Sequence, residues 1–345
     1  MKIHFLGKPK DLDIEIIDEL KNIRQRSEIL SICPKPTGYS WLGVQVASLS
    51  LFPDCTFQIP QNFSNQLLTD EQLQKLSNLL NELNFKQIVF NGFLPYFGKI
   101  IDKINIQTKI KVVYHGFLSE LSGNKKQIDA FNSMLIYVNK NRISAIGCVK
   151  KGLALSLSKL YSVPTFEIIL PNRCIAESVR NCDDNLNIGV LVNTSFRKNI
   201  HNQAVATIMK ENSILHTFRT NELSYLPQDR IKYYDLMSHD EFVDLLSQMT
   251  INIHVTFSEG MGGQVCSESI SQGVPCISAY TSSFFDYNED LKRKLIVEGF
   301  DDSWHIYKKI EEVLKDRESI GRECIAYAKL LNVLSQERST SFLDA

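Results

Sequence analysis

Residues 251–280 read INIHVTFSEGMGGQVCSESISQGVPCISAY, in which a strand-like run ends at Phe257 and a glutamate follows almost at once. A cluster of glycines then leads into a helical segment that stops at Gly273, with a proline just beyond it. Glycines permit tight turns and a close approach of backbone to ligand, and the unpaired amides at a helix start attract anions. The carboxylates of Glu259 and Glu268 flank these amides and can accept hydrogen bonds from sugar and ribose hydroxyls. This combination is suited to a nucleoside diphosphate sugar.

The alternation of β-branched runs with longer amphipathic segments extends over the whole chain and predicts parallel sheets with crossover helices. Strands are expected at Lys2–Leu6, Glu28–Cys33, Gln87–Asn91, Lys109–His115, Ile143–Cys148, Thr165–Leu170, Ile188–Val192, Ser213–Phe218, Ile231–Asp235, Ile251–Phe257, Pro275–Tyr280 and Lys294–Glu298. Helices are expected at Asp11–Arg26, Asp70–Leu83, Lys126–Asn139, His201–Lys210, His239–Met249, Gly263–Ser271 and Trp304–Leu314. In the last of these, helical spacing predicts a core face of Trp304, Tyr307, Ile310 and Leu314.

The domain organisation follows from length, because 345 residues exceed what one hydrophobic core commonly holds. We expect an α/β protein with two Rossmann-like, doubly wound domains that face each other across a cleft. Residues 1–170 would bind the acceptor and residues 171–316 the donor. Residues 317–345 would form a polar helix to about Gln336 and a frayed tail, and pack back on the first domain.

Composition excludes several classes of protein. The chain is 43% hydrophobic and 22% charged, as in ordinary globular proteins, and it contains no apolar run of membrane-spanning length. Its eight cysteines form no C-x-x-C pair, which favours free thiols in a reducing cytoplasm and argues against structural zinc. Residues 1–168 carry 20 Lys and Arg against 14 Asp and Glu. This basic half allows peripheral contact with the inner face of a membrane, although a chance scatter of solvated lysines on helix faces is the favoured alternative.

The run SEGMGGQVCSESISQGVPCISA resembles the donor motif of the group 1 glycosyltransferases, enzymes of the GT-B fold. The resemblance implies that Glu259 contacts the donor sugar and that Glu268 holds the ribose. It also implies that the amides around Gly260, Met261, Gly262 and Gly263 face sugar hydroxyls and phosphate. Glu259 and Glu268 enclose eight residues, one more than the family usually has.

Three further side chains match places that are functional in this family. Arg197 and Lys198 follow the strand expected at Ile188–Val192, where basic residues of the family contact the donor diphosphate. Surface charge is the alternative reading of this pair. His115 ends a strand and resembles a histidine near the donor sugar, although a histidine at a strand end is as often only structural.

The resemblance implies a glycosyltransferase that moves a hexosyl or N-acetylhexosaminyl group to a hydroxyl of a glycan, a lipid-linked glycan or a protein. Such enzymes retain the anomeric configuration and act in polysaccharide biosynthesis without a metal or a bound cofactor, and no nucleic acid is expected as a partner. Two alternatives remain open at this point. One is a nucleotide-sugar epimerase, and the other is a non-catalytic GT-B subunit that binds a nucleotide sugar or a partner.

Overall fold

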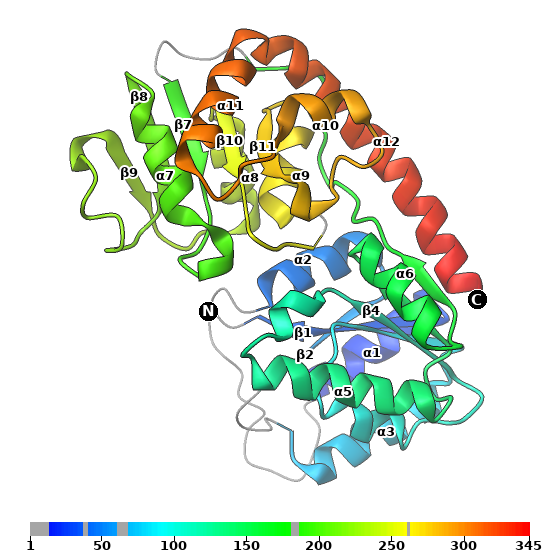
Figure 1. Ribbon diagram of the computed structural model, residues 1–345. Coiled ribbons are helices and arrows are strands. Elements are labelled where there is room, and N and C mark those ends of the chain that lie inside the picture. Colours follow the sequence, from blue (N-terminus) through cyan, green and yellow to red (C-terminus); the bar gives the residue numbers. More distant parts are fainter. Residues whose placement is uncertain (1–13, 37–40, 61–67, 181–185, 261–262) are drawn as a thin grey trace. The chain divides into compact units, whose positions relative to one another are not determined.

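The computed structural model describes residues 14–36, 41–60, 68–180, 186–260 and 263–345. The chain divides into two units, Met1–Leu170 together with Gln336–Ala345, and Pro171–Ser335 (Figure 1). The strand expected at Lys2–Leu6 lies outside the described residues.

The first unit is built on a parallel sheet whose described strands run in the order β2-β1-β3-β4-β5-β6. Its strands are β1 (Ile29–Lys35), β2 (Thr56–Pro60), β3 (Gln87–Asn91), β4 (Lys109–Tyr114), β5 (Ala145–Cys148) and β6 (Thr165–Glu167). Its helices are α1 (Ile14–Arg26), α2 (Leu42–Leu51), α3 (Asp70–Leu83), α4 (Phe97–Ile101), α5 (Lys125–Asn139) and α6 (Lys151–Leu160). The central strands are buried along almost their whole length, as expected for a parallel sheet with both faces covered.

The second unit repeats this plan with the described strand order β12-β11-β10-β7-β8-β9, again all parallel. Its strands are β7 (Leu186–Val190), β8 (Ser213–Phe218), β9 (Ile231–Tyr234), β10 (Ile251–His254), β11 (Cys276–Ala279) and β12 (Ile296–Val297). Its helices are α7 (Ile200–Met209), α8 (His239–Ser247), α9 (Gly263–Ser271), α10 (Glu289–Leu295) and α11 (Ser303–Lys315). The sheet is therefore the doubly wound kind, in which chain order reverses between β7 and β10.

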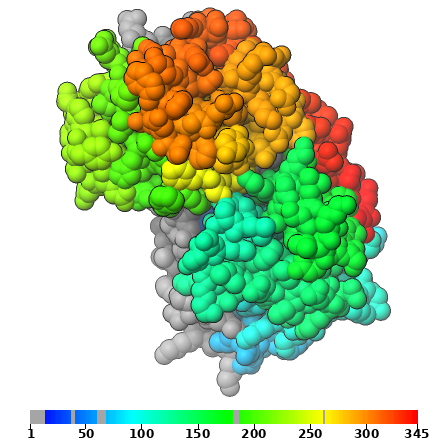
Figure 2. Space-filling view, in the orientation of Figure 1, coloured from blue at the N-terminus to red at the C-terminus, as the bar shows by residue number. Residues whose placement is uncertain are grey.

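Two sequence expectations about secondary structure and core were wrong. The strand β2 was not expected, although it pairs along its whole length with β1. Helix α11, orange in Figure 2, lies at the surface of the second unit and buries Ile306, Ile310 and Val313. Of the four residues expected in its core face, only Ile310 is buried. Tyr307 and Leu314 are half-buried, and Trp304 is 51% exposed because it lies on another side of the helix.

The last helix, α12, runs from Arg317 to Asp344, well beyond the expected end near Gln336. From Gln336 onward the chain belongs to the first unit, where Phe342 is fully buried and its ring lies 6.0 Å from that of Phe166. The segment expected to fray therefore contributes to a hydrophobic core.

A buried lysine caps the end of this helix. Lys111, on β4, is completely buried, and its Nζ donates to the carbonyl oxygens of Phe342 at 2.7 Å and Leu343 at 2.6 Å. Burial and the nearby Lys109 lower the pKa of Lys111 to about 8. The last carbonyls of a helix have no hydrogen-bond partner within the helix, and the negative end of the helix dipole attracts positive charge. Lys111 supplies both the hydrogen-bond donor and the positive charge.

We expect Lys111→Met to destabilise the first unit by about 1–3 kcal/mol, because methionine keeps the packing and leaves two buried carbonyls without a donor. Lys126→Met is the control, since Lys126 is exposed on α5 of the same unit and should change stability by less than about 0.5 kcal/mol. Thermal unfolding measures both, and amide exchange at residues 340–345 should accelerate only in Lys111→Met. Equal effects of the two substitutions would contradict the capping role.

Candidate functional site

The candidate site lies where the sheet of the second unit reverses its strand order. β7 and β10 are neighbours in the sheet. The chain that leaves β7 continues to β8 on one side, and the chain that leaves β10 continues to β11 on the other. Ligands of open α/β sheets bind outside the carboxyl ends of the strands at such a reversal. Arg197 and Lys198 lie on the short helix η2 (Phe196–Lys198) that follows β7, and Glu259 follows β10. Two segments far apart in sequence thus meet at one edge of the sheet.

The strand β10 ends at His254, three residues earlier than expected, because other groups take its next backbone partners. The Val255 amide donates to Gln203 Oε1 at 2.9 Å, and the Phe257 amide donates to the Arg197 carbonyl at 2.8 Å. The first contact involves α7 and the second involves η2. Buried backbone amides need such partners, so these two contacts fix the path of the chain toward Glu259.

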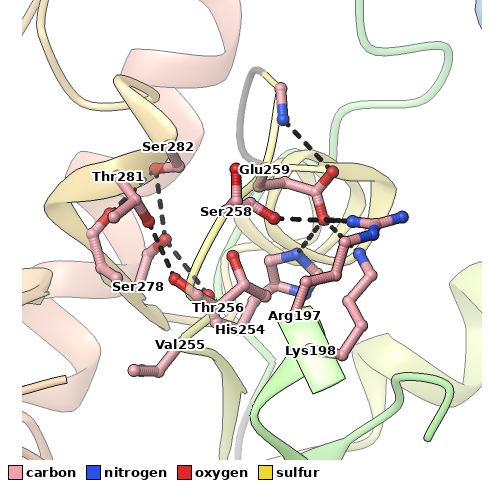
Figure 3. A network of polar contacts seen from close by, with 12 residues as sticks. Arg197, Lys198, His254, Val255, Thr256, Ser258, Glu259, Ser278, Thr281 and Ser282 are labelled. Atoms are coloured by element: carbon pink, nitrogen blue, oxygen red, sulfur yellow. Dashed lines mark hydrogen bonds and ion pairs between the residues drawn. The ribbon is translucent and has the colours of Figure 1, made fainter. Parts of the chain in front are cut away.

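Two hydroxyl groups hold the carbonyl side of the same segment (Figure 3). Ser278, on β11, donates to the His254 carbonyl at 3.3 Å, and Thr281 donates to the Thr256 carbonyl at 2.8 Å. Thr281 lies on η4 (Tyr280–Ser282), which follows β11 directly. The end of β10 is therefore held from both sides, and the glutamate that follows it has a defined position.

The Glu259 carboxylate is the centre of a charged cluster (Figure 3). Its Oε2 lies 3.3 Å from Arg197 Nη1 and 3.3 Å from His254 Nε2, and it forms an ion pair with Lys198 Nζ. Its Oε1 accepts a hydrogen bond from the Gly260 amide at 3.2 Å. The side chains of Glu259 and Lys198 are only 11% and 12% exposed, whereas that of Arg197 is 31% exposed. The cluster is mostly desolvated and opens to solvent on the arginine side.

The electrostatics of the cluster favour an ionised glutamate and a neutral histidine. Burial acts to raise the pKa of Glu259, but Lys198, the His254 hydrogen bond and Arg197 outweigh it, so this pKa lies well below its ordinary range. Burial, followed by the charge of Lys198, lowers the pKa of His254. Two cations then face one carboxylate, so the cluster has a net charge of one positive unit. This excess charge suits an anion that arrives at the strand ends.

A second contact lies further along α9. Glu268 Oε1 accepts a hydrogen bond from His239 Nε2 at 2.9 Å, and His239 is the first residue of α8. The preceding residue, Ser238, caps this helix through a reciprocal contact with Glu241. The other carboxylate oxygen of Glu268 is buried and has no hydrogen-bond partner among the described residues. It is an acceptor in place for a ligand hydroxyl.

The remaining predicted residues fall in different places. His115 follows β4 in the first unit, its Nε2 is buried with no partner in the described part of that unit, and burial lowers its pKa to about 4. Gly263 opens α9 with φ +64°, a left-handed conformation that favours glycine. Met261 and Gly262 lie outside the described residues. The structure thus brings together Arg197, Lys198 and Glu259, with the Gly260 amide beside them.

Sequence reasoning missed two histidines of the site, His254 and His239. His254 is the only polar ring in a four-residue strand that is buried throughout, and a buried polar residue at a strand end is an informative signal. His239 stands at the first position of a capped helix, where nothing in the local pattern connects it with Glu268. Its partner lies 29 residues away, so only the fold reveals the pair.

The described residues contain neither a cluster suited to a metal ion nor a helix that could span a membrane. No group of three or more His, Cys, Asp or Glu side chains among them is arranged to hold a metal ion. No helix in the described ranges is long and apolar enough to cross a membrane. The seven cysteines in these ranges are free thiols.

Comparison with solved structures identifies the class of fold. Sucrose-phosphate synthase from Thermosynechococcus elongatus has a TM-score of 0.66 at 12% identity, over 92% of this chain and 100% of that one. WaaG, a glycosyltransferase involved in lipopolysaccharide biosynthesis, has a TM-score of 0.64 at 11% identity, over 91% and 99%. Anabaena HepE in complex with UDP-glucose has a TM-score of 0.64 at 12% identity, over the same shares. The two parallel α/β units are those of a GT-B protein.

A match to a sequence family identifies part of the chain more closely than the fold does. Residues 191–330 match the family described as glycosyl transferases group 1, so the resemblance seen in the sequence motif is confirmed for this segment. The segment includes the charged cluster, Glu268 and His239. A search of curated proteins finds no match to the chain.

Glu259→Gln should destabilise the second unit at pH 7 by about 1–3 kcal/mol, less than the ~3–5 kcal/mol of a fully buried pair because Arg197 reaches solvent. The substitution leaves two cations side by side without their counter-charge. The pKa of Glu259 is depressed in the folded state, so its stabilising effect is complete above the ordinary value of 4.5 and is lost as pH falls through the depressed pKa. The difference between wild type and variant should therefore be constant from pH 5 to neutrality and shrink in acid.

Denaturant unfolding across this pH range measures that difference. Glu298→Gln is the control, because Glu298 is exposed in the same unit. A gap between wild type and Glu259→Gln that persists undiminished in strong acid would show that the ion pair is not its source.

Proposed function

We propose that this protein is a glycosyltransferase that moves a sugar from a nucleoside diphosphate donor to an acceptor hydroxyl. The observation that carries the proposal is the Arg197–Lys198–Glu259 cluster at the strand-order reversal, inside the segment that matches the family. A diphosphate leaving group gains negative charge as the glycosidic bond breaks. Fixed cations aimed at that charge stabilise the transition state more than the bound donor.

Each side chain has a role in this mechanism. Arg197 and Lys198 bind the diphosphate, and the excess positive charge of the cluster draws it to the ends of β7 and β10. The Glu268 oxygen that has no partner in the described ranges accepts a ribose hydroxyl, while His239 keeps the other oxygen in place. Glu259 accepts a hydrogen bond from a hydroxyl of the donor sugar. It does so on the side of the carboxylate that the bound diphosphate does not cover.

The finer parts of the proposal come from the family resemblance. They are a hexosyl or N-acetylhexosaminyl donor, retention of configuration without a metal, and an acceptor that is a glycan, a lipid-linked glycan or a protein. The leaving phosphate oxygen would help to take the acceptor proton, so no side chain needs to act as a general base. UDP-glucose is the first donor to test, because the structure of the similar HepE holds that molecule.

Incubation with UDP-, GDP- and ADP-sugars, with and without a panel of acceptor glycans, tests the proposal. Release of nucleoside diphosphate that depends on an acceptor, together with a glycosylated product, is the expected result. An isomerised donor sugar would instead identify an epimerase. Tight donor binding without turnover for any pair would identify a non-catalytic GT-B subunit.

The two glutamates should respond differently to truncation. Glu268→Ala should weaken nucleoside diphosphate binding by about tenfold, as expected for the loss of one hydrogen bond to a charged group. Glu259→Ala should mainly lower kcat, because its contact is made to the transferred sugar. Calorimetry with the free nucleoside diphosphate and steady-state kinetics separate the two effects, with the exposed Glu298→Ala as control. Equal affinities and rates in all three variants would refute these roles.

A further inference from the structure

Among the described residues the imidazole of His254 makes one hydrogen bond, and that bond is to the central carboxylate of the site. The side chain is 1% exposed, and its Nε2 lies 3.3 Å from Glu259 Oε2. A carboxylate only accepts hydrogen bonds, so Nε2 carries the proton and Nδ1 is left with a lone pair. Nδ1 is buried and has no partner among the described residues. Burying a histidine with one nitrogen unpaired lowers the stability of the folded state. The contact of His254 with Glu259 is the feature that offsets this cost.

The surrounding structure leaves this ring little freedom to move. The His254 carbonyl accepts a hydrogen bond from Ser278, and the next amide donates to Gln203. On the other side lies Gly263, where a Cβ would come within 2.9 Å of His254 Nε2. The glycine at this position therefore makes room for the imidazole. Both the backbone and the ring of His254 are held in a single arrangement.

Donor binding changes the demands on Glu259. In the donor-free cluster the carboxylate has two cationic partners, Arg197 and Lys198. A diphosphate competes for the same cations, and its charge repels the carboxylate. His254 is too deeply buried to reach the phosphates and is neutral, so its hydrogen bond to Glu259 does not have to be shared.

We propose that His254 is a positioning residue, whose Nε2–H holds the Glu259 carboxylate toward the donor sugar when Arg197 and Lys198 bind the diphosphate. The proposal rests on the proposed function and extends it to a residue that does not touch the substrate. It explains why a histidine occupies the last position of a fully buried strand. The glycine that begins the neighbouring helix leaves room for the ring, in addition to adopting a left-handed backbone conformation.

Two substitutions separate the hydrogen bond from the packing. His254→Leu fills a similar volume and has no donor. His254→Gln places an amide nitrogen the same number of bonds from Cβ as Nε2, and so can restore the contact. We expect kcat for transfer to fall by about 10–100-fold in His254→Leu, the size of effect that a misplaced group has. His254→Gln should recover most of this loss.

A binding measurement distinguishes positioning from a collapsed site. Affinity for the free nucleoside diphosphate should change by less than about threefold in both variants, because that ligand carries no sugar for Glu259 to receive. The proposal is overturned if His254→Leu keeps the wild-type kcat, or if His254→Gln is as slow as His254→Leu. It is also overturned if nucleoside diphosphate affinity falls in parallel with kcat.

A spectroscopic measurement tests the contact independently of turnover. In ¹⁵N-histidine spectra of the full chain, His254 should be a neutral ring protonated at Nε2, assigned by its disappearance in His254→Gln. Its signal should shift in Glu259→Gln. A ring protonated at Nδ1 would overturn the proposal even if transfer is observed. A correct tautomer in a protein without transfer to any acceptor would instead count against the proposed function alone.

Discussion

The end of β10 is the constraint on which the candidate site depends. A strand that continued to Phe257 would direct alternate side chains to opposite faces of the sheet and separate His254 from Glu259. Instead, Gln203, Ser278 and Thr281 take up the backbone groups that neighbouring strands would otherwise bond. The chain then turns so that a carboxylate five residues on from His254 reaches its ring. Elements on both sides of β10 thus fix the position of the Glu259 carboxylate.

The charges of the site follow from the same geometry. Arg197 and Lys198 are adjacent in sequence, and one glutamate from another strand end pairs with both. Because the cluster is mostly shielded from water, these charges act strongly on each other and on any ligand. The two cations proposed to bind phosphate are therefore held in place before a ligand arrives. Such preorganisation avoids reordering two long side chains at the moment of binding.

Much of this could be predicted from sequence, and the failures have physical causes. Alternating apolar segments predict both sheets, and the glycine-rich turn between two glutamates predicts the site. The contacts His254–Glu259 and His239–Glu268 could not be predicted, because periodicity says nothing about how a side chain is oriented at a strand or helix end. Trp304 was misplaced because helical spacing defines a face without saying which face is buried. The length of α12 was underestimated because its polar composition conceals Phe342.

The course of α12 also bears on how the protein is made. A ribosome synthesises the sheet of the first unit early, and its last strand is β6 (Thr165–Glu167). Phe342 completes the hydrophobic core of that unit, yet it comes more than 170 residues later, as do the carbonyls that Lys111 caps. The amino-terminal unit can therefore close its core only after the whole second unit has been translated. Until then part of its apolar core is uncovered, which is the kind of surface that chaperones bind.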